Sequence, residues 1–376
     1  MTSKERVLMA ISHQEADRVP LGEWQFGPEI INPVIGRETL AFAGLKSAQA
    51  YWEGRRDDVV EDWKRNLSAV VRRLGWDTVL VHNVIGERPA IEVPERTGED
   101  TWKYANGDIL VYSRETDRLM FTERGAKKAA AEPAGDGGAS LEPSASELEV
   151  VRHVVKEFGD THFIFSAALL GHPALNFSDA TVSEVETWVR LYEDPDRFAG
   201  ELMDNLKHPN TALGIQVAKR EGVDGIAYGW DFGCNTGPFI APELFRKVVQ
   251  PYLAGIASMI HKHGLPMLLH SCGNNMAVMD MIVEAGVDVY QSIQSEMGIV
   301  NLKKRFGKNI TLWGGVTAGD LVSSTPEKVR AAAEECLLAC KPGGGFIFGT
   351  SHSIMPGAKY ANYLAMLEAH KEFGQY

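Results

Sequence analysis

The sequence predicts an α/β fold and, within that class, a (β/α)8 TIM barrel. Short apolar runs typical of strands recur along the chain, and segments with helical period lie between most of them. Strands that alternate with helices pair in parallel. About seven such units, with an eighth blurred, favour a closed barrel over an open doubly wound sheet. The open sheet remains the alternative, although no Gly-x-Gly-x-x-Gly turn follows a first strand.

The predicted elements follow one another in a regular order. Helices are expected over residues 2–12 and 52–74. The expected strands cover residues 78–82, 162–168, 225–228, 266–270, 287–292, 310–314 and 345–350. Residues 242–263, 275–285 and 325–340 have helical period, and Pro242 and Pro326 are start signals for two of these helices.

One region interrupts this alternation. Residues 86–122 are β-rich and charged, with Asn106-Gly107 as a hairpin turn signal. Residues 123–147, rich in Ala, Gly, Pro, Ser and Glu, are expected to form a flexible loop. We interpret both as an excursion between barrel strands, so that residues 1–376 form a single domain.

Composition excludes several classes of function. The net charge of -12 offers no basic stripe for phosphates, so nucleic acid is not an expected partner. No run of about 18 apolar residues occurs, and no apolar segment follows the N-terminus, so the expectation is a cytoplasmic protein without a membrane span. Four cysteines in 376 residues do not make a disulfide framework.

A candidate metal site lies where the predicted strand over residues 266–270 ends. His270 and Cys272 stand two residues apart, and alternate residues of an extended chain point to the same side. The pair could therefore bind one ion together; the alternative is a buried histidine beside a small buried thiol. His352 follows the last predicted strand and could complete a zinc site with an open position. Its alternative role is that of a general acid or base.

Other polar and aromatic residues follow the predicted strands or stand near their ends. Asp231 is expected to position substrate or to orient a ligand, and Glu23 could join the metal site or form an ordinary hydrogen bond. Because functional residues of such barrels gather at the carboxyl ends of strands, the remaining candidates are expected to bind substrate. They are Trp24, Phe26, His82, Trp230, Asn274, Gln291 and Gln294, although the aromatic ones could equally be core residues.

Several of these segments resemble one family in order along nearly the whole chain. They are Lys4-Glu-Arg-Val-Leu-Met-Ala-Ile-Ser-His-Gln-Glu-Ala-Asp-Arg-Val-Pro20, Asp231-Phe-Gly-Cys-Asn-Thr-Gly-Pro-Phe-Ile-Ala-Pro-Glu-Leu-Phe245, His270-Ser-Cys-Gly273, Glu284-Ala-Gly-Val-Asp288 and Gly343-Gly-Gly-Phe346. Together they resemble the uroporphyrinogen decarboxylase superfamily, which is built on a (β/α)8 barrel.

The resemblance distinguishes two branches. The decarboxylases carry Arg-Gln-Ala-Gly-Arg near the N-terminus, whereas this chain reads Gly22-Glu-Trp-Gln-Phe-Gly27 there. Without those cations a polyanionic tetrapyrrole has no evident binding site. The other branch, the zinc-dependent corrinoid methyltransferases, holds zinc with His-x-Cys and a late Cys. His270 and Cys272 match the first two ligands, Ser351-His352 stands at the late position, and Glu23 is a sensible fourth ligand.

The resemblance therefore implies a methyltransferase that uses zinc as a Lewis acid. A site with two His, one Cys and one Glu suits a hard oxygen better than a thiol, which favours demethylation of a methoxylated aromatic donor. The chain has no Asp-x-His-x-x-Gly motif, so the Co(I) corrinoid would come from a separate protein. The alternatives are methyl transfer from a corrinoid protein to a thiol, a metal-independent decarboxylase-like enzyme, and a binding protein without turnover. The chain could also form a homodimer.

Overall fold

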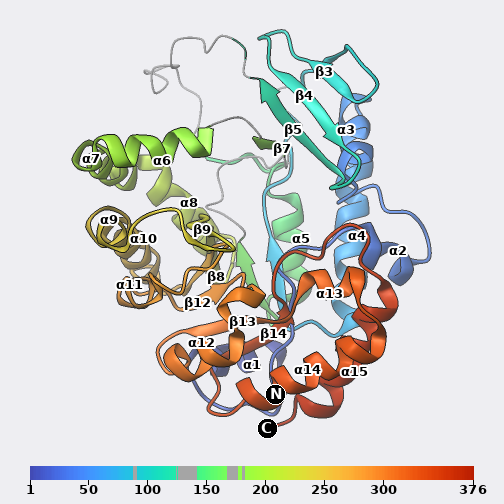
Figure 1. Cartoon of the computed structure of the whole chain (residues 1–376). Helices are drawn as coiled ribbons and strands as arrows, with labels where there is room; N and C mark the ends of the chain where they lie inside the picture. The colour runs from blue at the N-terminus through green and yellow to red at the C-terminus, as the bar shows by residue number, and fades with distance from the viewer. Residues whose placement is uncertain (88–90, 124, 126–141, 167–176, 180–182) are drawn as a thin grey trace.

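A parallel sheet of seven strands forms the centre of the computed structural model (Figure 1). The structure describes residues 1–87, 91–123, 125, 142–166, 177–179 and 183–376. The strands, in their order across the sheet, are β1 (Thr78–Val81), β6 (Phe163–Ser166), β8 (Gly225–Gly229), β11 (Met267–His270), β12 (Val289–Gln291), β13 (Thr311–Val316) and β14 (Phe346–Thr350). All six pairings between neighbours are parallel.

Residues 20–22 close this sheet into a barrel. The backbone N–H groups of Phe348 and Gly22 form hydrogen bonds with Pro20 and Phe348 respectively, which attaches the segment to β14. On its other side, the carbonyl of Leu21 accepts a hydrogen bond from the backbone N–H of Asp77, just before β1. The blurred eighth unit of the sequence is thus a short bridge, and the predicted barrel is confirmed.

Helices surround the sheet and connect its strands. They are α1 (Ser3–Ile11), α2 (Pro28–Ile35), α3 (Gly44–Trp52), α4 (Arg56–Leu74), α5 (Glu149–Phe158), α6 (Ser183–Glu193), α7 (Pro195–Lys207), α8 (Pro209–Arg220), α9 (Pro242–Leu244), α10 (Gln250–His261), α11 (Met279–Glu284), α12 (Ile299–Phe306), α13 (Ala318–Ser323), α14 (Pro326–Cys340) and α15 (Tyr360–Phe373). A π-helical turn, Phe245–Val249, joins α9 to α10, and a 3-10 turn covers Ser295–Met297. None of the described helices is both long and apolar enough to cross a bilayer.

The helix expected over residues 52–74 starts later than predicted. The helix α4 begins at Arg56, because Gly54 takes a positive φ of 75° and separates it from α3. At its other end Gly75, with a φ of 71°, stops the helix in the left-handed conformation that glycine tolerates. The first helix is fixed by a capping box, in which Thr2 and Glu5 each accept a backbone hydrogen bond.

A second sheet stands over the barrel (Figure 1). Its strands are β2 (Glu95–Arg96), β3 (Thr101–Lys103), β4 (Ile109–Ser113), β5 (Arg118–Glu123) and β7 (Phe177–Asp179). The first four are antiparallel and lie mostly in the β-rich stretch expected over residues 86–122, whereas β7 joins parallel to β5. Most of the loop expected over residues 123–147 lies outside the described residues.

The interior of the barrel is filled by large apolar side chains. One cluster of buried residues contains Phe163, Phe165, Leu268, Trp313 and Ile347 from four strands. Such a barrel is a packed core and not a pore. Functional groups must therefore lie at the rim of this barrel.

We predict that Gly349→Ala destabilises the barrel at its closure. A methyl group there would lie 2.0 Å from the carbonyl oxygen of Gly22, and that backbone is held by β14 and β1. Overpacking of this kind costs about 1–3 kcal/mol, which urea unfolding would measure. Gly319→Ala is the control: its nearest neighbour would be Thr317 Cγ2 at 3.9 Å, so stability should stay the same or rise slightly. Wild-type stability of Gly349→Ala would contradict the closure described here.

Candidate metal centre

Three side chains that could hold a metal meet at the carboxyl ends of two strands. His270 ends β11, Cys272 follows it, and His352 lies two residues after β14. The Sγ atom of Cys272 lies 3.4 Å from Nε2 of His270 and 3.0 Å from Nε2 of His352. All three ligand atoms lie within 4.8 Å of one another. The structure thus brings together two residues of one strand end and a third that is 80 positions away.

Neighbouring groups orient the imidazole of His270. Its Nδ1 contacts Oε1 of the buried Gln291 on the adjacent strand, and its ring stacks on Trp24 with centroids 4.5 Å apart. Burial lowers the pKa of His270 to about 4, so the ring is neutral at pH 7. A neutral ring that donates from Nδ1 leaves the Nε2 lone pair directed toward Cys272, which is the arrangement a metal-binding histidine needs.

Two neighbouring residues hold Cys272 in place. The backbone N–H of Cys272 donates to Oδ1 of Asp231 at 2.7 Å, and Oγ of Ser292 lies 3.4 Å from the Cys272 sulfur. Burial, aided by the negative charge of Asp231, raises the pKa of Cys272 to about 12. A thiol in this setting keeps its proton until a cation replaces it. Ser292 itself has a φ of 82°, a strained conformation that occurs often at functional sites.

Glu23, the expected fourth ligand, lies outside this group of three. It is 2% exposed, and its Oε2 accepts hydrogen bonds from the backbone N–H and the hydroxyl of Thr350. Burial raises its pKa to about 7. The hydroxyl of Thr350 also lies 2.6 Å from the carbonyl oxygen of His352. Glu23 therefore contacts the segment that carries His352, and the described geometry does not make it a ligand.

The other predicted residues lie in three different places. Trp24, Phe26 and His82 line a cavity that is connected to the candidate ligands through Trp24, whose ring stacks on His270. Asn274 and Gln294 instead hold the loop after β11: the backbone N–H of Asn274 donates to Cys234, and Gln294 Oε1 accepts from the backbone of Gly273. Trp230 is similarly separate, since it stacks on Trp188 and meets Tyr252 at its edge.

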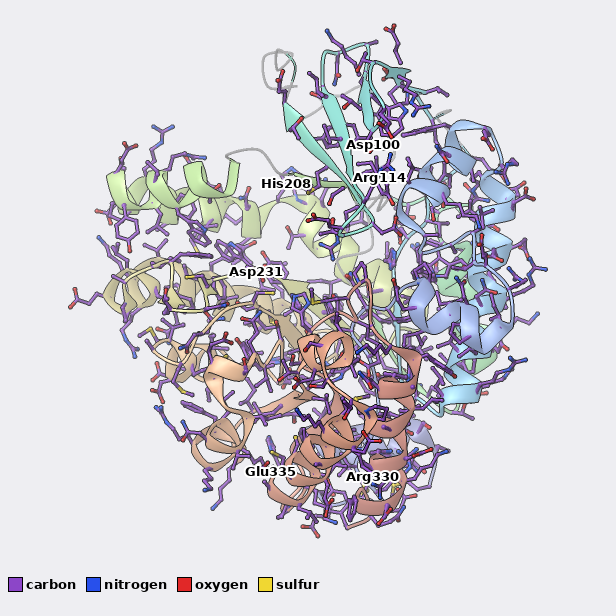
Figure 2. The ribbon with its side chains drawn as sticks, turned by 45° about the vertical axis from the view of Figure 1, so that its right-hand side comes forward. Asp100, Arg114, His208, Asp231, Arg330 and Glu335 are labelled. Carbon is purple, nitrogen blue, oxygen red and sulfur yellow. The ribbon has the colours of Figure 1, made fainter. Side chains whose placement is uncertain are left out.

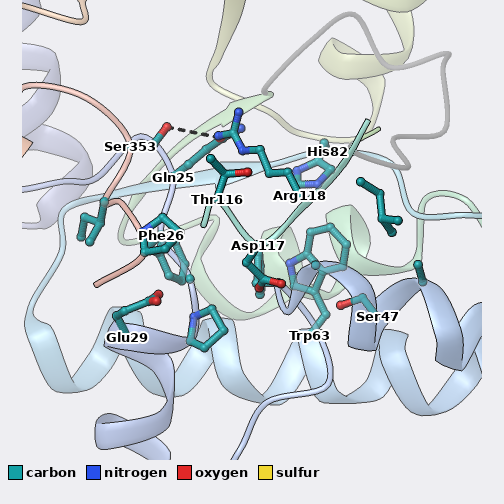
Figure 3. Close-up of a pocket in the computed structure, with 18 of the residues that line it drawn as sticks. Gln25, Phe26, Glu29, Ser47, Trp63, His82, Thr116, Asp117, Arg118 and Ser353 are labelled. Carbon is teal, nitrogen blue, oxygen red and sulfur yellow. Dashed lines mark hydrogen bonds between the residues drawn. The ribbon is translucent and has the colours of Figure 1, made fainter. Parts of the chain in front are cut away.

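The cavity has a volume of about 200 Å³, and aromatic side chains form part of its wall (Figure 3). Trp24 is shared between this wall and the stack on His270, and Ser353, the neighbour of His352, lines it as well. The ring of His82 packs edge-on against Trp63, and burial lowers its pKa to about 4. A small ring bound here could contact Trp24, whose other neighbour is the candidate ligand His270.

Sequence reasoning missed part of this cavity. The turn between β4 and β5 contributes Thr116 and Asp117, and β5 begins with Arg118; the walls also contain Glu29, Phe42, Ser47, Tyr51 and Trp63. Ser292, which supports the thiol, was missed as well. No local signal marks these residues, because they reach the cavity only through the packing of the second sheet and of the segments between residues 28 and 63 onto the barrel.

Comparisons with known proteins agree with this architecture. Residues 148–373 match the family model described as Uroporphyrinogen decarboxylase (URO-D). Proteins of that name from Coxiella burnetii and Thioalkalivibrio sulfidiphilus are 26% identical over 187 residues and 29% identical over 186 residues. These alignments cover 49% and 48% of this chain, and about half the length of the relatives, 49% and 50%.

A solved structure described as a methyltransferase from Methanosarcina mazei is similar over the whole chain. It has a TM-score of 0.67 and 18% sequence identity, and the match covers 99% of each chain. At this identity the likeness shows a shared fold alone.

We predict that Cys272→Ser loses most of the zinc affinity and keeps the fold, because the thiol lies at the barrel rim and not in the packed interior. Metal analysis after dialysis against zinc should give about one ion per chain for the wild type and far less for the variant. Cys234→Ser is the matched control, since that thiol is exposed on the neighbouring hairpin. Full zinc retention by Cys272→Ser would refute the metal centre.

Gln291→Met should weaken zinc binding by about 10–100-fold, because His270 loses the acceptor that orients its ring. Competition with a chromophoric chelator would measure the change. Gln291→Glu keeps an acceptor at the same place and should bind zinc at least as tightly as the wild type. Equal affinity for zinc in the wild type and Gln291→Met would show that Gln291 has no part in orienting the ligand.

Proposed function

The chain belongs to the uroporphyrinogen decarboxylase family, and within it we propose a methyltransferase that moves a methyl group from a methoxylated aromatic compound to the Co(I) corrinoid of a separate protein. The observation that carries this proposal is the position of the three candidate ligands beside an aromatic cavity. Two imidazoles and one thiol suit zinc with an open coordination position.

The residues present fit such a metal. His270, Cys272 and His352 would hold zinc, and the neutral state of His270 leaves its nitrogen free to bind. Bound zinc would supply Lewis acidity at the ether oxygen of the donor. Cys272 would give up its proton when the ion binds. Asp231, through the backbone of Cys272, would keep the sulfur in place.

The cavity would hold the aromatic part of the donor. Trp24, Phe26 and Trp63 offer ring faces and edges on which an aromatic ring can pack. An apolar cavity of about 150 Å³ is enough for benzene, so about 200 Å³ has room for one substituted ring. In the reaction the methyl carbon exchanges its bond to the ether oxygen for a bond to the nucleophile. The oxygen leaves with the electron pair as a phenolate.

A tetrapyrrole decarboxylase fits this site less well. A substrate with many carboxylates needs several cations, and Arg118 is the one arginine or lysine among the residues that line the cavity. The N-terminal stretch between residues 22 and 27 adds a carboxylate and no cation. We therefore favour a metal-dependent methyltransferase over a tetrapyrrole decarboxylase, although the similar proteins are decarboxylases.

Methyl transfer to a thiol is the second candidate of the same class. A ligand set with one thiolate donates less negative charge to zinc than a set with two, so it favours polarisation of an oxygen over activation of a thiol. A binding protein without turnover is the third candidate. One experiment separates the three.

The zinc-loaded chain should transfer methyl groups from methoxylated aromatic compounds to cob(I)alamin, which the loss of the Co(I) absorption and the appearance of the free phenol would report. Cys272→Ser should lose this activity. Transfer from methylcobalamin to thiols, without attack on any aromatic ether, would support the second candidate instead. No transfer in either direction by zinc-loaded protein would refute the methyltransferase.

A further inference from the structure

A hairpin turn with a fixed backbone conformation places Arg118 at the cavity. The turn between β4 and β5 ends in Asp117, whose φ is 46°, and Tyr112 donates a hydrogen bond of 2.8 Å to its carboxylate. The turn rests on Gly44, where a methyl group would lie 2.2 Å from both an Asp117 carboxylate oxygen and its carbonyl oxygen. Arg118 is the next residue, so its backbone is fixed by this close contact between the second sheet and α3.

The side chain of Arg118 extends toward the loop that follows β14. Figure 3 shows it running toward Gln25 and Ser353, the residue after His352. Arg118 is also one of the residues that line the cavity.

Arg118 has no ion-pair partner within the part of the chain that the structure describes. Arg114, four residues earlier, differs: it pairs with Glu99 at 2.6 Å and with Asp100 at 2.8 Å on the second sheet (Figure 2). A guanidinium that lines a cavity and forms no ion pair with a protein carboxylate can bind an anionic ligand.

The two carboxylates of the cavity have other contacts. Asp117 accepts the hydrogen bond from Tyr112. Glu29 lies in the first turn of α2, where the helix dipole favours a negative charge, and it contacts the backbone N–H of Gly357 at 3.4 Å. His82 is neutral at pH 7, as its lowered pKa shows. Hydrogen bonds thus hold both carboxylates in place, and Arg118 is the cation among the residues that line the cavity.

We propose that this cavity selects a single aromatic ring that carries a carboxylate, and that Arg118 binds the carboxylate. The aromatic walls would take the ring, and the planar guanidinium would pair with the carboxylate through two hydrogen bonds. A quaternary ammonium compound would also be attracted to aromatic faces, but Arg118 would repel it. The inference deepens the proposed function, on which it relies for the methoxy group alone.

Binding of three aromatic probes tests the proposal: benzoate and benzamide, which have nearly the same shape and differ in charge, and the cation phenyltrimethylammonium. The full chain is first treated with a chelator, so that no zinc can bind the carboxylate. Quenching of tryptophan fluorescence should report binding, because Trp24 and Trp63 line the cavity. We expect the wild type to bind benzoate about 10–100-fold more tightly than benzamide, as charge-assisted hydrogen bonds imply.

Three variants test whether Arg118 causes the preference for benzoate over benzamide. Arg118→Gln should bind benzoate and benzamide equally, and Arg118→Lys should keep part of the preference. Arg114→Gln, which removes a charge from the same hairpin, should bind like the wild type. Equal binding of the two probes by the wild type would overturn the proposal, and so would tighter binding of phenyltrimethylammonium or an unchanged preference in Arg118→Gln.

The test also separates the two proposals of function and specificity. It needs neither zinc nor a corrinoid, so a missing preference for benzoate would refute the carboxylate site and leave methyl transfer open. Selective benzoate binding by a chain that transfers no methyl group would refute the methyltransferase and keep the carboxylate site.

Discussion

The closure of the barrel at residues 20–22 is the constraint on which the rest of the site depends. The buried carboxylate of Asp77 accepts a hydrogen bond from the backbone N–H of Leu21 at 2.7 Å and pairs with both Arg6 and Arg18. This charge is buried but paired, as a stable interior carboxylate must be. The chain then continues directly into Glu23 and Trp24, so the closure places Trp24 against His270 and Glu23 against Thr350.

The closed barrel explains how distant residues meet. Parallel strands end at one rim, so His270 and Cys272 after β11 come to face His352 after β14, although two strands separate them in the sheet. The packed interior below excludes water from one side of the group. The same burial that keeps His270 neutral keeps Cys272 protonated until a cation arrives. The site is therefore suited to gain a metal and not to hold a free charge.

The sequence predicted the barrel and the position of the three candidate ligands, because strand ends can be identified from apolar runs and turn signals. It did not predict side-chain direction after those ends. Asn274 and Trp230 follow strands as His270 and Cys272 do, yet they face the supporting loop and a separate aromatic cluster. Glu23 is near the site, but packing turns its carboxylate toward Thr350.

The contribution of the second sheet could not be predicted at all from local patterns. The β-rich composition between residues 86 and 122 indicates strands, but the approach of Asp117 to Gly44 depends on the whole docked sheet. The positive φ of Ser292 is a similar case, since a serine has no local preference for it and the surrounding structure must impose it.

Zinc K-edge X-ray absorption of the zinc-loaded chain tests the central claim most directly. The structure predicts a single sulfur at about 2.3 Å and two imidazole nitrogens at about 2.0–2.1 Å, with the remaining coordination filled by a lighter atom. A spectrum with two sulfur ligands, or with none, would contradict the site formed by His270, Cys272 and His352.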